Sequence, residues 1–199
     1  MPTLPAWSIL KGKTAAITEK SHNGTTGIGL AIALEFIRQG CNVVINHLGL
    51  PKDEHLHHSL LAEVEVLHKN GSSTGQVLEL AGDAIGPQTL KDLVQAAVKQ
   101  WGGLDIFQGG GGSIIAISSV SALVGGRLQN TLYANKSSGT IAHAIDESDK
   151  KAYLEGGIPL RGVGDPEDMA GPAVFLASEH MSRYANGSGL LADGGMFSN

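Results

Sequence analysis

The chain of 199 residues has the length of a single domain, and its 42% hydrophobic residues are enough to bury a core. Its net charge of -5, without a block of Lys or Arg, argues against nucleic acid or an anionic membrane as the main partner. The lone Cys41 excludes an internal disulfide and fits a reducing compartment. Because no stretch has the roughly 18 apolar residues of a membrane span, and the N-terminus lacks a secretory pattern, we expect one cytoplasmic domain over residues 1–199.

Strand-like and helix-like segments alternate through the first half of the chain. Short, β-branched apolar runs predict buried strands, and longer segments with apolar residues at helical spacing predict helices. This order favours an α/β fold, a mainly parallel sheet covered by helices on both faces. The predicted strands are 14–18, 42–46, 76–80 and 104–107, and the predicted helices are 27–40, 56–69 and 88–101.

The alternation breaks after residue 107. Gln108 and the four glycines of 109–112 lead directly into another apolar run at 113–118, which predicts a further strand. Parallel neighbours need a crossover of a dozen residues or more. The connection therefore allows only a hairpin or a bend within one long strand.

The last third contains two further elements. The segment 165–178 predicts a helix with Pro166 in its first turn, which Pro172 bends or restarts. Residues 190–192 predict a short terminal strand.

A glycine-rich loop joins the first strand to the first helix. In this position glycines let backbone N–H groups approach a pyrophosphate at the positive end of a helix, although a tight turn that only connects the two elements would have the same pattern. The second strand ends at Asn46 with neither an acidic residue nor a nearby Arg for the ribose 2′ position. The loop residues are Gly24, Thr25, Thr26, Gly27, Ile28 and Gly29.

Thr18, this loop and the following AIALEF resemble the Thr-Gly-x-x-x-Gly-x-Gly start of the short-chain dehydrogenases/reductases, with Asn23 in place of the first glycine and 19–22 inserted. The resemblance implies a Rossmann-type, doubly wound fold that binds NADP or NAD, with Asn46 among the cofactor-binding residues. The end of the second strand favours NADP slightly. Asp83 is similar to the family's adenine-contacting Asp; it could equally be a helix cap or turn residue.

Ser119, Tyr133 and Lys136 resemble the family's Ser…Tyr…Lys constellation. The resemblance implies that Tyr133 is the general acid/base, that Lys136 lowers its pKa and holds the nicotinamide ribose, and that Ser119 binds the reacting oxygen. An unperturbed Tyr titrates near pKa ~10 and needs an adjacent cation to act at neutral pH. Tyr133 and Lys136 are three residues apart rather than the family's four, and Leu132 stands at the expected Tyr position. A surface Tyr and Lys without a catalytic role is the alternative.

The segment after Lys136 is similar to the family's loop over the nicotinamide, which assigns Thr140 and Ile141 to cofactor binding. Only Ser137 intervenes, whereas relatives have a long helix and a strand there. The Asn-Asn-Ala-Gly stretch and the helix that follow the fourth strand in relatives are also missing. We therefore expect a fold abbreviated around the fourth to sixth strands. The sequence does not exclude a homo-oligomer, but the helices that usually form its interface in the family are missing.

The C-terminal third follows the family order through 158–160, 163–168, 175–178 and 193–195. Within the family, NVVINHLG, SALVGG and GGMF look most like sugar 1-dehydrogenases of the L-rhamnose type, which oxidise an aldose at C1 to its lactone. The resemblance implies an NAD(P)-dependent oxidoreductase with a sugar or small alcohol as its small-molecule substrate. The alternatives are a catalytically impaired nucleotide-binding remnant or regulatory module, and a shortened product that folds poorly. The histidines around 55–68 predict a solvated helix face rather than a metal site.

Overall fold

The computed structural model describes residues 8–18, 27–51, 54–105, 112–118, 158–160 and 164–196. At its centre lies a parallel sheet of three strands in the order β1-β2-β3. In the register of the sheet, Ala16 lies beside Val44, and Val44 lies beside Leu78. The strands are β1 (Thr14–Thr18), β2 (Asn42–His47) and β3 (Val77–Ala81).

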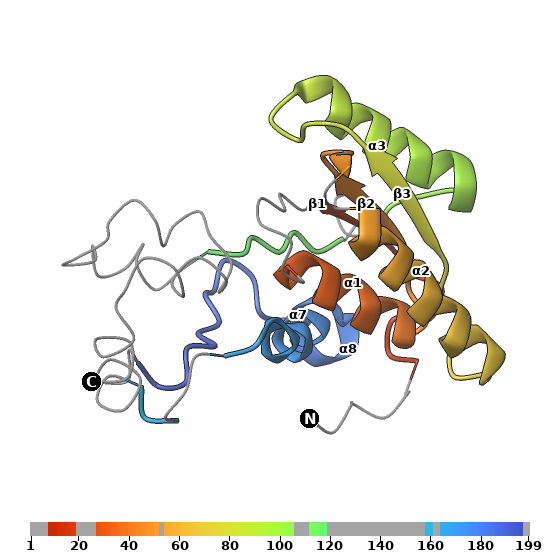
Figure 1. The fold of residues 1–199 in the computed structure, drawn as a ribbon. Coiled ribbons are helices and arrows are strands. Elements are labelled where there is room, and N and C mark those ends of the chain that lie inside the picture. Colours follow the sequence, from red (N-terminus) through yellow and green to blue (C-terminus); the bar gives the residue numbers. More distant parts are fainter. Residues whose placement is uncertain are drawn as a thin grey trace, which may run out of the picture.

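Helices cover both faces of this sheet (Figure 1). Helix α1 (Ile28–Arg38) connects β1 to β2, and α2 (Glu54–Lys69) connects β2 to β3, on the same face. Helix α3 (Pro87–Trp101) packs on the opposite face. Its C-cap is Gly102, whose left-handed backbone conformation (φ 84°) is favourable for glycine because a Cβ would be strained there. This arrangement confirms the predicted α/β fold with a parallel sheet.

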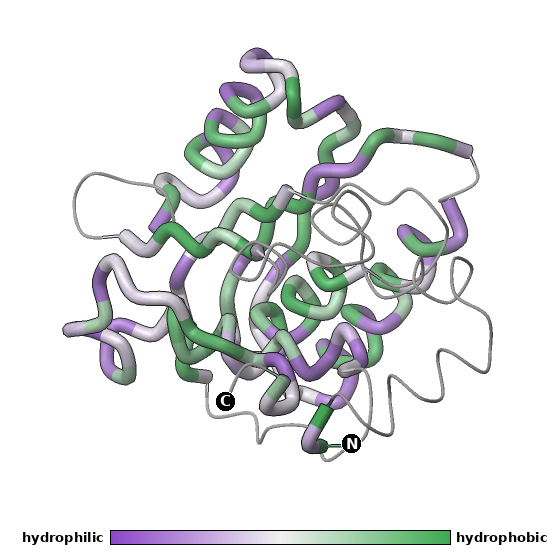
Figure 2. The backbone as a smooth tube through the Cα atoms, turned by 90° about the vertical axis from the view of Figure 1, so that its left-hand side faces the viewer, coloured by the Kyte–Doolittle hydropathy of each residue, from purple (hydrophilic) through white to green (hydrophobic). Residues whose placement is uncertain are grey.

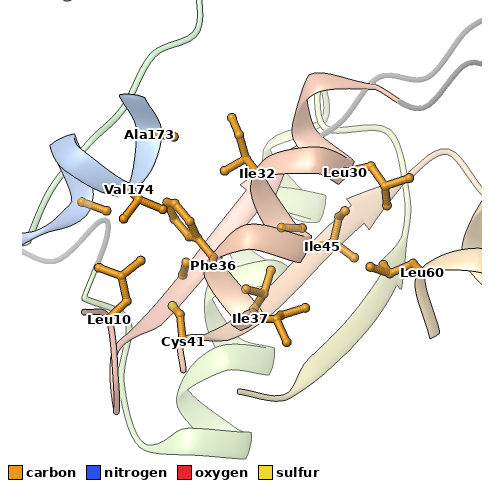
Figure 3. Close-up of a cluster of buried hydrophobic side chains, with 14 of the residues drawn as sticks. Leu10, Leu30, Ile32, Phe36, Ile37, Cys41, Ile45, Leu60, Ala173 and Val174 are labelled. Atoms are coloured by element: carbon orange, nitrogen blue, oxygen red, sulfur yellow. The ribbon is translucent and has the colours of Figure 1, made fainter. Parts of the chain in front are cut away.

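The larger apolar core lies between the sheet and α1, α2 and α7 (Ala170–Ala177). Figure 3 shows the Phe36 ring of α1 directed toward Val174 of α7, and Leu60 of α2 beside Ile45 of β2. All four side chains are buried. The C-terminal helix is therefore tied to the first βαβ unit through α1, although more than 130 residues separate Phe36 from Val174 (174 − 36 = 138).

A smaller apolar core lies between the sheet and α3. Its buried members from this helix are Leu93 and Ala97, which pack on Ala16 and Val44. The helix is amphipathic, and its tube in Figure 2, at the top, changes repeatedly between hydrophobic and hydrophilic colours. None of the described helices is long and apolar enough to cross a membrane.

The C-terminal helical region begins as a 3₁₀ turn, η3 (Pro166–Met169), and continues as α7. The Asp165 N–H donates to Asp168 Oδ2 (2.8 Å), which is half of a capping box. Pro172 lies in the first turn of α7, where its missing N–H costs nothing. The prediction that Pro172 bends or restarts the helix is not confirmed, because the change from 3₁₀ to α falls at Ala170 and Pro172 lies within α7. A short helix, α8 (Glu179–Ser182), follows.

Two predicted strands are wrong. The segments 113–118 and 190–192 are not strands in the structure. A strand needs a ladder partner, and most of the side chains of 113–118 are exposed instead. Of the predicted strand 104–107, the structure describes only Leu104 and Asp105, and these two residues are not a strand. The Asp105 N–H donates to Thr14 O (2.9 Å), at the start of β1. The Ser113 N–H donates to Asp105 O (3.2 Å), so Ser113 lies beside Asp105.

Candidate nucleotide-binding site

The N-terminus of α1 lies at the carboxyl edge of the sheet, because β1 precedes it in a parallel βαβ unit. Its first helical bond runs from the Ala31 N–H to Gly27 O (3.1 Å), and no side chain caps the preceding turn. The N–H groups of Ile28, Gly29 and Leu30 therefore have no acceptor within the helix. No acidic residue lies in this turn. Open N–H groups at the positive end of a helix suit a pyrophosphate.

The structure describes only the second half of the predicted phosphate loop. Gly27, Ile28 and Gly29 lie at this helix terminus, where Gly27 is buried. Gly24, Thr25 and Thr26 lie outside the described residues. Their contact with a cofactor stays a prediction.

Asn46 at the end of β2 is 1% exposed and points to the α3 side of the sheet, as its neighbour Val44 does two residues before. Its Nδ2 donates to Leu80 O (3.0 Å) and to Gly82 O (2.9 Å). Its Oδ1 is buried without a hydrogen-bond partner in the described part of the chain. The side chain therefore holds the turn after β3, and its predicted contact with the cofactor stays untested.

Asp83 lies in that turn and is exposed. Its Oδ1 accepts from the Ile85 N–H (3.0 Å), and its backbone O accepts from the Gly86 N–H (3.0 Å). The N-cap of α3 is Gly86, so Asp83 is a turn residue and not the helix cap. Its exposed carboxylate at the carboxyl edge of the sheet remains the predicted adenine contact.

A histidine cluster at the same edge was missed by sequence reasoning. The Nδ1 of His57, in the first turn of α2, lies 2.9 Å from Glu79 Oε1 on β3. The His47 ring, at the end of β2, lies against that of His57 with centroids 3.9 Å apart. The prediction of a solvated helix face is wrong for His57, because its side chain is partly buried against the sheet. The alternation of side chains along a strand could have indicated this contact, because it places the polar Glu79 on the side of β3 that faces α2.

The predicted catalytic and nicotinamide-loop residues lie outside the described part of the chain. The described segment 112–118 ends one residue before Ser119. The others are Tyr133, Lys136, Thr140 and Ile141. Their roles stay predictions.

A parallel sheet between two layers of helices, with an uncapped helix N-terminus at its carboxyl edge, defines the class of Rossmann-type nucleotide-binding domains. Ligands of such open sheets bind outside the carboxyl ends of the strands. The residues present therefore fit a dinucleotide at the edge formed by Gly27, His47 and Asp83.

No family model matches the chain. The chain is 35% identical to the L-rhamnose-1-dehydrogenase of Scheffersomyces stipitis, covering 96% of this chain and 98% of that protein. It is 31% identical to an L-rhamnose 1-dehydrogenase (NAD(P)(+)) of a Sphingomonas species, with the same shares covered. A corresponding enzyme of Azotobacter vinelandii is 30% identical over 96% of this chain and 99% of that protein.

Solved structures have the same fold. A short-chain type dehydrogenase/reductase from Mycobacterium marinum has a TM-score of 0.71 at 21% identity, covering 96% of this chain and 97% of that one. An NADH-dependent reductase complexed with NAD has a TM-score of 0.67 at 22% identity, covering 96% and 98%. The chain belongs to the short-chain dehydrogenase/reductase family, whose members are NAD(P)-dependent oxidoreductases.

The alignments also show that the chain is shorter than these relatives. The one with the Scheffersomyces enzyme runs over 264 positions, so at least 65 of them (264 − 199) have no counterpart here. Because 98% of that enzyme is spanned, most of these positions are internal. The prediction that internal segments of the family are missing is confirmed.

Proposed function

We propose that this chain is an NAD(P)-dependent sugar dehydrogenase that oxidises L-rhamnose, or a closely similar aldose, at C1 to the lactone. The observation that carries this proposal is its 35% identity with an L-rhamnose-1-dehydrogenase across 96% of the chain. We further propose that residues 1–199 act as one domain in the cytoplasm. The small-molecule substrate would enter at the carboxyl edge of the sheet.

The described residues support the cofactor part of this proposal. The uncapped first turn of α1 offers the N–H groups of Ile28, Gly29 and Leu30 to the pyrophosphate. Asn46 holds the turn that presents Asp83 to the adenine, through its two bonds to Leu80 O and Gly82 O. When bound, the oxidised nicotinamide accepts the hydride from C1 of the sugar.

The proposed proton transfer uses the three residues that resemble the family's constellation. The Tyr133 phenolate takes the proton of the C1 hydroxyl as the hydride leaves. The Lys136 ammonium lowers the Tyr133 pKa, so that the phenolate forms near neutral pH. Ser119 hydrogen-bonds the same oxygen and orients it, and Thr140 and Ile141 cover the nicotinamide.

The experiment is cofactor binding followed by turnover, on the purified full chain. We would titrate NADP⁺ and NAD⁺ by calorimetry and then follow nicotinamide reduction with L-rhamnose and other aldoses. Tyr133→Phe is expected to keep cofactor binding and to lose about 100-fold or more of kcat, the usual contribution of a general acid/base. Tyr184→Phe, at a fully exposed tyrosine, is the matched control and should behave as the unmodified chain.

The outcomes separate the proposal from its alternative. Cofactor binding without turnover of any aldose would indicate a nucleotide-binding remnant, a reading that the 65 or more missing positions favour. Failure to bind either cofactor, in a sample that is folded by circular dichroism, would overturn the dehydrogenase proposal. Equal losses in Tyr133→Phe and Tyr184→Phe would remove Tyr133 from the mechanism.

A further inference from the structure

The tripeptide Asn-Gly-Ser occurs twice among the described residues, at 70–72 and at 186–188. An asparagine followed by glycine deamidates readily, because glycine has no Cβ to shield its backbone nitrogen from the asparagine side chain. The two copies share this sequence, so a difference in their reactivity within the folded chain has to come from the structure. A third Asn-Gly pair, Asn23-Gly24, lies outside the described residues and is not part of the proposal below.

The two copies are alike in exposure and in the space around them. All three residues of each copy are exposed. Gly71 and Gly187 both have a left-handed backbone, with φ values of 63° and 68°. A Cβ on either glycine would meet nothing within 4 Å. Neither exposure nor crowding therefore distinguishes the two sites.

Backbone hydrogen bonds hold the first copy in place at the end of α2. The Gly71 N–H donates to His68 O (3.0 Å). The Ser72 N–H donates to Leu67 O (2.9 Å). Together these bonds form a Schellman motif, in which the glycine follows the helix cap. The nitrogen that would attack the Asn70 side chain is therefore occupied as a donor, and the backbone around it is fixed in the last turn.

The second copy lacks such bonds. It begins the segment 186–192, which follows α8 and is neither helix nor strand. Every residue of this segment is exposed. Its backbone N–H and C=O groups have no hydrogen-bond partner within the part of the chain that the structure describes. The Gly187 nitrogen is thus accessible, and no hydrogen bond fixes the torsion angles of Asn186.

We propose that Asn186 is a site of spontaneous deamidation, and that the end of α2 protects Asn70 from the same reaction. The deprotonated Gly187 nitrogen attacks Asn186 Cγ. A nitrogen–carbon bond forms, the Cγ–Nδ2 bond breaks, and the side-chain nitrogen leaves as ammonia. Water then opens the cyclic imide at either of its carbonyl groups, which leaves aspartate or isoaspartate and one added negative charge. The reaction uses neither cofactor nor sugar, so it does not depend on the proposed function.

The Schellman motif sets the expected difference between the two rates. Both of its hydrogen bonds have to open before the Gly71 nitrogen can reach the Asn70 side chain. A typical backbone hydrogen bond is worth roughly 5-fold in such an opening equilibrium. Two bonds together give about 25-fold, so we expect Asn186 to deamidate about 25 times faster than Asn70 in the folded chain.

The experiment follows both sites in one sample of the purified full chain, shown to be folded by circular dichroism. The sample is incubated at mildly alkaline pH, where the glycine nitrogen loses its proton more readily. Aliquots are digested at acidic pH, so that digestion adds no deamidation. Mass spectrometry then gives the fraction of each Asn-Gly peptide that has exchanged an amide for a carboxylate, and we expect the Asn186 peptide to convert first.

Incubation in concentrated urea is the matched control. Because both copies have the sequence Asn-Gly-Ser, unfolding should make the two rates nearly equal. Asn186→Gln should abolish the conversion of its own peptide and leave the rate at Asn70 unchanged. Gly187→Ala places a methyl group beside the attacking nitrogen, in open space, and should slow the reaction at Asn186 alone.

The outcomes decide the proposal in either direction. A ratio near the expected value in the folded chain, which disappears in urea, would support it. Equal rates at the two sites of the folded chain, or a faster reaction at Asn70, would overturn it. An Asn186 peptide that stays unconverted in the folded chain, while both peptides convert in urea, would overturn it as well.

Discussion

The buried amide of Asn46 allows a quantitative test of how the carboxyl edge of the sheet is built. Its Nδ2 donates to Leu80 O (3.0 Å) and Gly82 O (2.9 Å), and the residue is 1% exposed. Asn46→Asp keeps the shape but places a carboxylate against two carbonyl oxygens. An ionised carboxylate there has no donor, so burial and the carbonyl dipoles raise the pKa of the new Asp above the value of about 3.9 in the unfolded chain.

The direction of the pH effect follows from this raised pKa. Below about pH 4 both states carry the proton and the charge costs nothing. Above it the unfolded Asp ionises while the folded one stays neutral, so stability falls as pH rises, until the folded group also ionises. The slope is about 1.36 kcal/mol per pH unit as long as the folded Asp stays neutral, so we expect the free energy of unfolding, relative to the unmodified chain, to fall between about pH 5 and pH 7 by at most about 2.7 kcal/mol.

The assay is urea denaturation followed by circular dichroism at both pH values, with two controls. Asn46→Leu removes the donors without adding a charge, and should cost about 1–3 kcal/mol at either pH. Asn70→Asp adds a carboxylate at an exposed site and should show little dependence on pH in this range. A cost of Asn46→Asp that is the same at both pH values would refute the reasoning, because it would mean that the carboxylate remains hydrated.

Three further predictions concern the core. Phe36→Ala should lower the free energy of unfolding by about 3–5 kcal/mol, and Val66→Ala, at a residue 55% exposed, by less than about 0.5 kcal/mol; equal losses would contradict the contact between α1 and α7. Burial raises the pKa of the Cys41 thiol to about 12, so it stays protonated and should react with an alkylating reagent only after denaturation; a native rate like that of a free thiol would be inconsistent with this. A Cβ at Gly75 would meet two backbone oxygens, so Gly75→Ala should cost about 1–3 kcal/mol in denaturation, whereas Gly103→Ala, with open space around it, should not; equal effects would argue against the close approach.

The elements of the first half were predictable because their signals are local. The strand 14–18 is found with the bounds that its apolar run predicts, and the second strand extends only one residue further, to His47. The helix predicted over 27–40 is found as Ile28–Arg38. Each signal is a periodicity within one segment, and each element buries the face that this periodicity defines.

What could not be predicted depends on partners distant in the sequence. The run 113–118 has a strand-like composition, but composition cannot show whether a neighbouring strand is available to pair with it. The burial of His57 depends on Glu79, which is 22 residues away and on another element. The sequence predicts that Asn46 lies at the carboxyl end of the second strand. It does not predict that the Asn46 side chain donates to Leu80 O and Gly82 O, because these acceptors depend on the turn after β3.

The two faces of α3 give a last test of how the shortened chain is stabilised. Leu93 is buried against the sheet, whereas Val94 and Val98 on the outer face are 40% and 43% exposed. We expect Leu93→Ala to cost about 2–5 kcal/mol. Val94→Lys with Val98→Gln should change stability by less than about 0.5 kcal/mol each, because these residues have better helix propensity and lose little buried area. If the outer-face variant, measured by urea denaturation, costs as much as Leu93→Ala, the outer face of α3 does not have the solvent exposure on which this prediction depends.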